Sequence, residues 1–345
     1  MNKKQFKQLF RVVLLVGTVV SLFFVPWILV KAWILPLPDT VQAQVDEAIG
    51  YGFDGMIVYV DQAGKPPAFY AAGWKDRQRE IPADPQALFK IASINKLYIA
   101  ASIAKLAHSE RLSLDDTVAN YFPELIGRLD YADEITVQMM AQHRSGIANF
   151  TNNPAFWENE QENGKNAIEF ALAMPSSFEP DRGYEYSNTN YLLLSLIIDK
   201  VVGYSHTQYI REEILTPLNL TNTFFSLDEV DLDDVMSGYY VGVDEDFKSN
   251  EYGMLATAED VGVFLRALND GSVFKEGEQE IYSSIYVYEH GGLVPGYQSL
   301  AEYHKDIDTV VVQFLNTTDF NGYQWNLSEI FINRIVKILK NQGDS

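Results

Sequence analysis

The stretch of sequence that decides the fold is IASINKLYIAASIAKLAHSERL, residues 91–112. Its apolar residues recur every three to four positions, which is the spacing of a helix packed on a core, so we expect one helix over 91–112. Ser93 and Lys96 lie near its start, and residues three apart share one face of a helix. The stretch therefore predicts a buried helix whose first turn carries a hydroxyl beside an amine.

This pair of side chains is suited to nucleophilic catalysis. A serine hydroxyl needs a neighbouring base, and lysine is a base only where its surroundings lower its pKa from about 10.4. Burial would lower it, and the helix N-terminus offers backbone N–H groups to an oxyanion. The alternative is an ordinary helix start with Ser93 as N-cap. A second Ser-x-x-Lys match, Ser272 to Lys275, leads into a charged loop and is interpreted as a chance match.

A tyrosine motif lies in GYEYSNTNYLLLSLIIDKVVG, residues 183–203. Tyr186 and Asn188 precede an apolar helical segment, so we expect both on a loop that faces a cleft. A phenol held near a lysine can relay the serine proton. The alternative is a loop tyrosine packed on the core, with the asparagine as a helix cap.

A glycine motif, His290-Gly291-Gly292-Leu293, closes an expected strand over 285–290. Paired glycines on a strand indicate close approach of another backbone or of a ligand. A substrate strand could pair there, and the Leu293 N–H could serve as the second oxyanion donor. The alternative is a bulge or a turn.

The remaining segments predict an α+β fold. Both ends of the chain supply strands for one antiparallel sheet flanked by helices, and 113–250 reads as a mostly helical lobe. We expect one domain over 39–345, with an α/β lobe from 39–112 and 251–345 and a cleft between the lobes. The expected elements are helices at about 40–50, 257–271 and 326–340, strands at 55–61 and 67–73, and three strands within 285–316.

The N-terminal segment predicts a membrane anchor. Residues 12–30, VVLLVGTVVSLFFVPWILV, carry no charge and follow a basic flank, so they are long enough for one spanning helix. Positive charge favours the cytoplasmic side. We expect 1–38 to be a cytoplasmic stub and anchor in the cell membrane, with the catalytic domain outside. The alternative is a signal peptide and secretion after cleavage.

The composition excludes several classes of site. The absence of cysteine removes disulfides and thiolate chemistry, and the spacing of the five histidines fits no metal motif. No phosphate-binding glycine loop or Gly-x-Ser-x-Gly elbow is present, so we expect no metal and no cofactor. Beyond residue 38, 21 basic residues stand against 47 acidic ones, a net charge of −26. A nucleic-acid partner is therefore not expected.

Together the three motifs resemble a known family. Ser-x-x-Lys, Tyr-x-Asn and His-x-Gly in this order are similar to the signature of class C β-lactamases, related D-alanyl-D-alanine carboxypeptidases and their esterase relatives. The resemblance extends over about 40–320. It rests also on the blocks RLSLDDTVANYFPE (111–124), ITVQMMAQHRSGI (135–147), ILTPLNLTNTFF (214–225), YGMLATAEDVGVFL (252–265) and HGGLVPGYQS (290–299).

The resemblance implies a role for each motif residue. Ser93 would be acylated, Lys96 and Tyr186 would share proton transfer, and water would release the acyl group. Asn188 would hold a substrate amide, and Gly292 belongs to the same substrate-binding edge. His290 would hydrogen-bond near Tyr186 or bind a substrate carboxylate. The backbone amides of Ser93 and Leu293 would form the oxyanion hole.

The chain also departs from the family pattern. Glu289 and Ser195 stand where many relatives have glycine, Arg144 replaces a small residue, and Asp181 follows Pro180 in place of glycine. The stretch 271–289 is shorter than in the lactamases, which argues against an efficient β-lactamase.

We therefore expect a serine hydrolase that acts through an acyl-serine on a small or peptide-like substrate. D-alanyl-D-alanine-type carboxypeptidase or esterase activity, or weak β-lactamase activity, is expected, on a substrate that could derive from peptidoglycan. The alternative is a membrane-tethered, catalytically inactive protein that binds peptides or cell-wall fragments.

Overall fold

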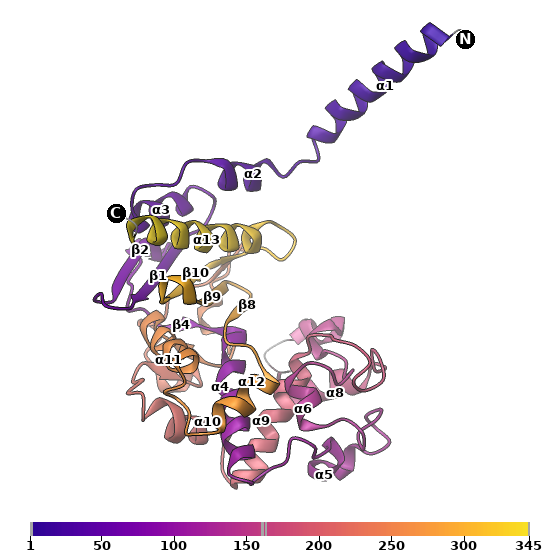
Figure 1. Cartoon of the computed structure of the whole chain (residues 1–345), viewed down its shortest axis with the longest axis vertical. Coiled ribbons are helices and arrows are strands. Elements are labelled where there is room, and N and C mark those ends of the chain that lie inside the picture. Colours follow the sequence, from indigo (N-terminus) through magenta and orange to yellow (C-terminus); the bar gives the residue numbers. More distant parts are fainter. Residues whose placement is uncertain (1–2, 160–161, 163, 344–345) are drawn as a thin grey trace.

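The computed structural model describes residues 3–159, 162 and 164–343, and it has an α+β architecture (Figure 1). One antiparallel sheet has the strand order β3-β2-β1-β10-β9-β8, so its centre joins a strand from near the N-terminus to one from near the C-terminus. Met56 of β1 pairs with Leu315 of β10. The strands are β1 (Gly55–Gln62), β2 (Ala68–Asp76), β3 (Ile81–Pro82), β8 (His290–Val294), β9 (Tyr297–His304) and β10 (Thr309–Leu315).

Helices cover both faces of this sheet, because alternate residues of a strand point to opposite sides. On β1, Met56 and Val58 pack in the core under α3 (Val41–Ile49) and α13 (Gln324–Gly343). Ile57 and Tyr59 pack in the larger core with α4 (Asn95–His108) and α11 (Ala258–Asp270). The sheet therefore separates two apolar layers.

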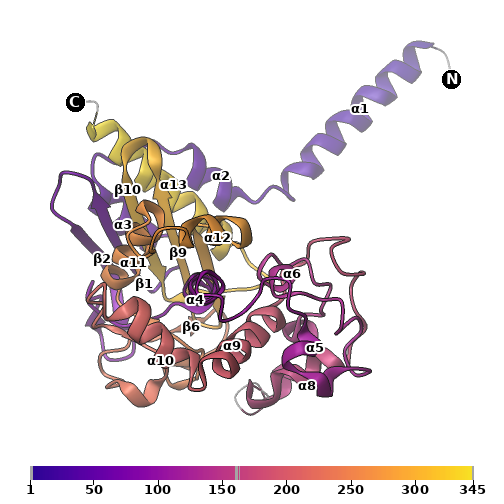
Figure 2. The ribbon, with the colours of Figure 1, turned by 60° about the horizontal axis from the view of Figure 1, so that its bottom comes forward.

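A mostly helical lobe lies beside α4 and the β8 edge, and Figure 2 shows its helices gathered around α9. It contains α5 (Val118–Tyr121), α6 (Val137–Ala141), α8 (Ala167–Leu172), α9 (Asn188–Val202) and α10 (His206–Ile210), while α12 (Glu278–Ile285) packs on α4. Two small sheets join the lobes: β4 (Phe89–Lys90) with β7 (Leu255–Ala256) and β5 (Thr223–Phe224), and β11 (Thr317–Thr318) with β6 (Tyr239–Tyr240).

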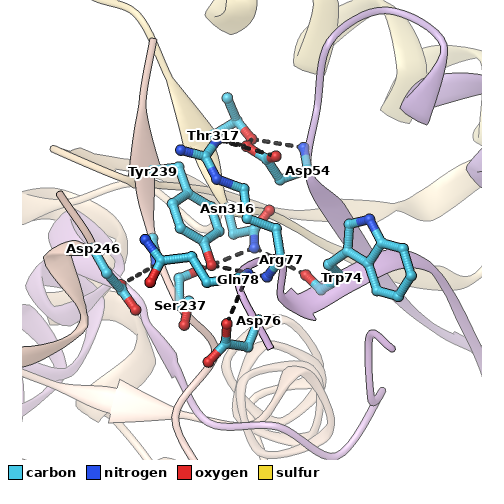
Figure 3. A network of polar contacts seen from close by, with 11 residues as sticks. Asp54, Trp74, Asp76, Arg77, Gln78, Ser237, Tyr239, Asp246, Asn316 and Thr317 are labelled. Carbon is cyan, nitrogen blue, oxygen red and sulfur yellow. Dashed lines mark hydrogen bonds and ion pairs between the residues drawn. The ribbon is translucent and has the colours of Figure 1, made fainter. Parts of the chain in front are cut away.

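A polar network fastens one end of the large sheet (Figure 3). Arg77 pairs with Asp54 at 3.1 Å, and its guanidinium lies 3.9 Å from the centre of the Tyr239 ring. Asp54 also accepts a hydrogen bond from the Thr317 hydroxyl. The next residue, Thr318, accepts from the Gly296 N–H at 2.7 Å, so the turn between β8 and β9 is held to the same end.

The predicted α+β fold is confirmed, as are most of its elements. The strand pair predicted at 55–61 and 67–73 is β1 and β2. The helix predicted at 257–271 is α11, which ends before Gly271 at φ 84°, a left-handed conformation that glycine adopts without strain. The helix predicted at 326–340 is α13, and Thr40 caps α3 through the Ala43 N–H.

Two boundary predictions are wrong. The stretch 91–112 is not one helix, because Ala92 has φ 49°: a 3₁₀ turn, Ala92–Ile94, precedes α4, which ends at His108. The strand expected over 285–290 is not formed: Ile285 is the last residue of α12, residues 286–289 are an irregular connection, and β8 begins only at His290. Tyr282 and Ile285 are both buried, and their spacing of three places them on one face of a helix.

The anchor predicted over 12–30 is also not one helix. α1 (Lys3–Leu22) ends before Pro26, and a second helix, α2 (Trp27–Ile34), follows. Proline lacks a backbone N–H and its ring clashes with the preceding turn, so the helix breaks there. None of α1 is buried, and it is long and apolar enough to cross a membrane or to act as a signal sequence. Residues 1–2 lie outside the described residues.

Candidate active site

The turn that carries Ser93 is the centre of the site. Lys90 is the last residue of β4. Two residues later the backbone of Ala92 lies in the left-handed region, at φ 49°, although Ala92 is not a glycine. Such a conformation is costly and is retained where packing enforces it. Gly292 of β8 packs against this turn, since a Cβ on it would lie 2.3 Å from the Ile91 oxygen and 3.0 Å from the Ala92 Cβ. The nucleophile candidate is thereby held against the sheet edge.

Lys96 lies beside Ser93, as the i, i+3 spacing predicts. Its Nζ is 3.1 Å from the Ser93 Oγ and donates to the Asn188 Oδ1 at 2.8 Å. The side chain is 4 % exposed. Burial penalises the ammonium form and lowers the pKa of Lys96 from 10.5 to about 7. Near neutral pH, a large fraction of this amine is therefore available as a base.

Tyr186 approaches Ser93 from the helical lobe. Its hydroxyl donates to the Ser93 Oγ at 2.7 Å. Burial raises the pKa of Tyr186 to about 12, so the phenol is protonated at physiological pH. The contact joins residues that are 93 positions apart in the chain.

Asn188 begins α9 on the same side of the site. Its backbone N–H donates to the Asn149 Oδ1 at 3.1 Å, and its side-chain nitrogen donates to Thr151 at 3.4 Å. The amide is therefore oriented with its oxygen toward Lys96. Asn149 and Thr151 were not identified from the sequence, since neither belongs to one of the three motifs.

His290 hydrogen-bonds to Tyr286 rather than directly to Tyr186. Its Nε2 lies 2.8 Å from the Tyr286 hydroxyl and its Nδ1 lies 2.5 Å from the Gly291 oxygen. Because a carbonyl only accepts, Nδ1 carries the hydrogen and Nε2 accepts from the phenol. Burial lowers the pKa of His290 to about 4. Its ring centre is 6.2 Å from that of Tyr186, so a neutral imidazole borders the site.

A further histidine, His143, is buried beside Tyr186 and was missed by the sequence analysis. Its ring centre lies 4.6 Å from that of Tyr186, and its Nδ1 accepts from the Ser187 N–H at 3.2 Å. Burial lowers its pKa to about 3, so it too is neutral. His143 lies inside the block 135–147 that supports the resemblance, which is the signal that would have identified it. It supports the loop that carries Tyr186.

The outer edge of β8 is the second wall of the site. β8 is an edge strand, and Val294 pairs with Tyr297 across the turn at 295–296. Hydrogen-bonded and non-hydrogen-bonded pairs alternate away from such a turn. The Leu293 N–H therefore points away from β9, toward the free edge. Ser93 and Leu293 line one cavity, which is a necessary condition for their backbone N–H groups to act together as oxyanion donors.

This cavity, of about 480 Å³, lies between the lobes. Its lining combines the polar residues Ser93, Lys96 and Asn188 with apolar residues that include Ile99, Phe150, Phe156, Trp157 and Leu192. Ser195, one of the departures from the family pattern, also lines it. A lining of apolar side chains with a few polar groups is typical of sites for small molecules.

Two other departures from the family pattern, Arg144 and Asp181, are in contact with each other. Arg144 Nε lies 2.5 Å from a carboxylate oxygen of Asp181, and its Nη2 donates to the Asp181 backbone oxygen at 2.8 Å. Asp181 has φ 63°. The pair ties the loop before Tyr186 to the segment that carries His143, so the two substitutions form one local contact.

Comparisons with known proteins identify the family. The family model described as Beta-lactamase matches residues 37–327. The D-amino acid amidase from Ochrobactrum anthropi SV3, in complex with L-phenylalanine amide, superposes with a TM-score of 0.77 at 23 % identity, covering 88 % of this chain and 98 % of that one. The penicillin-binding protein from Bacillus halodurans superposes with a TM-score of 0.72 at 17 % identity, and the match covers 86 % of this chain and 98 % of that one.

Curated relatives are similar over part of their length. Protein flp of Staphylococcus aureus (strain N315) is 29 % identical over 195 residues, which are 55 % of this chain and 39 % of that protein. Penicillin-binding protein 4* of Bacillus subtilis (strain 168) is 26 % identical over 175 residues, 50 % of this chain and 38 % of that protein. The matches thus cover less than half of each relative.

The chain belongs to the Beta-lactamase family. This confirms the resemblance and the expected class, a β-lactamase-related serine hydrolase.

Proposed function

We propose that this protein hydrolyses an amide or ester bond through an acyl intermediate on Ser93. The observation that carries the proposal is the position of the Ser93 Oγ, 3.1 Å from the Lys96 amine and 2.7 Å from the Tyr186 hydroxyl. A binding protein has no need for a nucleophile between a neutral amine and a phenol. The arrangement is that of an activated nucleophile with its base.

In the proposed reaction, neutral Lys96 takes the proton of Ser93 as Oγ attacks the substrate carbonyl carbon. The backbone N–H groups of Ser93 and Leu293 stabilise the oxyanion. The Tyr186 phenol, adjacent to Oγ, passes a proton to the leaving nitrogen or oxygen as the scissile bond breaks. Water then attacks the acyl-serine and gives a proton to the Tyr186 phenolate, the bond between Ser93 and the acyl group breaks, and Ser93 regains its proton from Lys96.

We further propose that the substrate is a small or peptide-like amide or ester with an apolar side chain. Asn188 would hold its amide, and the Gly292 edge of β8 would pair with its backbone. The wall of Phe150, Phe156 and Trp157 supports the apolar side chain. The likeness to a D-amino acid amidase supports a D-amino-acid derivative as the first substrate to test. The neutral state of His290 favours an uncharged group near it over a carboxylate.

We also propose that α1 anchors the protein in the cell membrane with the catalytic domain outside. The basic residues Lys3, Lys4, Lys7 and Arg11 precede the apolar part of α1, and such a flank favours the cytoplasmic side. Cleavage of this segment as a signal sequence is the competing outcome, and the N-terminal mass of the protein recovered from cells distinguishes the two.

The experiment for the catalytic proposal is covalent labelling of the full chain in detergent. A fluorophosphonate and a fluorescent penicillin are applied separately, and the modified residue is located by mass spectrometry, with Ser93→Ala as control. Labelling of Ser93 by the fluorophosphonate supports an acyl-serine hydrolase, and labelling by both supports a penicillin-recognising peptidase. Folded protein that reacts with neither is the result expected of the inactive binding protein.

A further inference from the structure

The short helix α2 carries an exposed apolar surface that the catalytic site does not use. Trp33 and Ile34 are each 72 % exposed, and Trp27 is 56 % exposed. Phe23 and Phe24, in the connector just before α2, are 82 % and 81 % exposed. We name these five residues the docking face. Clustered large apolar side chains mark an interaction surface, whereas isolated ones need no explanation.

The opposite side of α2 is fixed to the catalytic domain. Ala32 is fully buried in the core beneath α13. Arg334 of α13, itself 3 % exposed, donates to the backbone oxygens of Ala32, Leu35 and Pro36 at 3.1, 2.8 and 2.9 Å. These bonds satisfy carbonyl groups at the end of α2 that the helix leaves unpaired. α2 is therefore part of the domain and not a flexible tether.

The chain also restricts how far α2 lies from α1. The apolar part of α1, residues 12–22, is about 16 Å long, roughly half of the apolar thickness of a bilayer of about 30 Å, so the uncharged residues that follow α1 have to cross the rest. Only residues 23–26 connect it to α2, and such a connector reaches at most about 14 Å. With α1 in a bilayer, α2 lies at the level of the lipid headgroups, where tryptophan is enriched.

We propose that α2 is an interfacial helix, and that its docking face inserts into the headgroup region and holds the catalytic domain on the bilayer. The occupant is the lipid surface, because the connector places α2 there. Apolar insertion is the source of the affinity, since the remainder of the chain is strongly acidic and would be repelled by anionic lipids.

Docking in this way sets how far the active site lies from the bilayer. α2 packs on α13 and the core on one side of the sheet, whereas Ile94 and Leu97, next to Ser93, pack in the core on the other side. Figure 1 shows α2 and α4 separated by α13 and the sheet. Two packed layers of this kind place the site on the order of 20 Å from α2. The site therefore lies away from the membrane surface.

Site-directed spin labelling of the full chain in phosphatidylcholine bilayers tests the proposal, because the chain has no cysteine that would be labelled elsewhere. Three single variants, Ile34→Cys, Val16→Cys and Ile126→Cys, are labelled, and their collision rates with oxygen and with a water-soluble nickel chelate are compared. Ile126 is 59 % exposed on the helical lobe and serves as the matched control.

We expect the label at Val16 to lie in the apolar core of the bilayer. The label at Ile34 should lie at headgroup depth, with a collision rate with the nickel chelate at least fivefold lower than that of the label at Ile126. Both collision rates should change little in 0.5 M salt. A double substitution, Trp27→Glu with Trp33→Glu, on exposed positions, should return the label at Ile34 to the Ile126 level. Equal nickel contact at Ile34 and Ile126 in the unsubstituted background overturns the proposal. Dipolar coupling between Ile34 labels of two chains would also overturn it, in favour of a second copy as the occupant.

Discussion

The Lys96 amine lies 3.1 Å from the Ser93 hydroxyl oxygen in an environment that is almost completely buried. Burial lowers the pKa of Lys96 to about 7, so the base form is populated above that pH and lost below it. We predict that the second-order rate of fluorophosphonate labelling at Ser93 falls tenfold per pH unit below about pH 7 and is level above it. With the pKa of Tyr186 at about 12, no alkaline decrease is expected before about pH 11. A level rate down to pH 5 would contradict a base role for Lys96.

Replacement of Lys96 by arginine separates charge from basicity. Arginine stays protonated at all accessible pH values, so Lys96→Arg should lower the labelling rate by about 10²–10⁴-fold, the range for loss of a general base. The unfolding midpoint of the variant in urea gives the control for folding. An active Lys96→Arg protein would assign the base to another group.

The bond between Tyr286 and His290 gives a third prediction. Tyr286→Phe removes the donor to the His290 Nε2 and leaves a buried acceptor unpaired, which costs about 1–3 kcal/mol. If the imidazole orients the substrate edge, kcat/KM on a D-amino acid amide falls about tenfold. Tyr288→Phe is the matched control, because its hydroxyl contacts Ser283 and not the site. If Tyr286→Phe and Tyr288→Phe lower kcat/KM equally, the hydrogen bond from Tyr286 has only a structural role.

Gly292 gives a prediction about the closeness of β8 to the nucleophile turn. A Cβ at this position would meet the Ile91 oxygen at 2.3 Å and the Ser299 Oγ at 2.5 Å. Gly292→Ala should therefore lower the free energy of unfolding by about 1–3 kcal/mol and reduce the labelling rate at least tenfold, because the Leu293 N–H moves with the strand. Gly50→Ala is the control, since Gly50 has helical dihedral angles and lies at the end of α3. Full labelling of Gly292→Ala would exclude the backbone of β8 from the oxyanion site.

A buried ion pair on α4 gives a prediction about stability. Lys105 and Glu278 are 3.1 Å apart with side chains 5 % and 4 % exposed, and they join α4 to α12. Lys105→Met leaves the carboxylate buried without its partner, which costs about 3–5 kcal/mol. The double variant Lys105→Met with Glu278→Met should regain most of that loss in urea unfolding.

The exposed pair Arg128 and Glu169 is the matched control for this measurement. Its side chains are 49 % and 54 % exposed, so Arg128→Met should change the free energy of unfolding by less than about 1 kcal/mol. Similar losses for Lys105→Met and Arg128→Met would mean that the buried pair contributes no more than a surface contact.

Much of the fold follows from local patterns in the sequence. The unbroken apolar run of Met56, Ile57 and Val58 suits a strand covered on both faces. The helices that end at Gly50 and Gly271 carry their own stop signals. The boundary errors arose where tertiary packing overrides local spacing. Ala92 is held at a positive φ by its packing against β8, and no pattern in 91–112 predicts that. The break at Pro26, in contrast, was readable from the sequence.

The candidate site, like the fold, could be predicted from the sequence only in part. The sequence by itself determined that Ser93 and Lys96 are neighbours, because three residues of a helical turn fix their separation, and it identified the Tyr186, Asn188 and His290 motifs. Only the tertiary structure decided which groups meet them: Tyr186 reaches Ser93 across 93 positions, His143 packs under Tyr186, and Tyr286 bonds His290. Burial of Lys96 between the lobes, which lowers its pKa, is likewise a property of the assembled cleft. Local periodicity acts over a few residues, whereas these contacts depend on how distant segments pack.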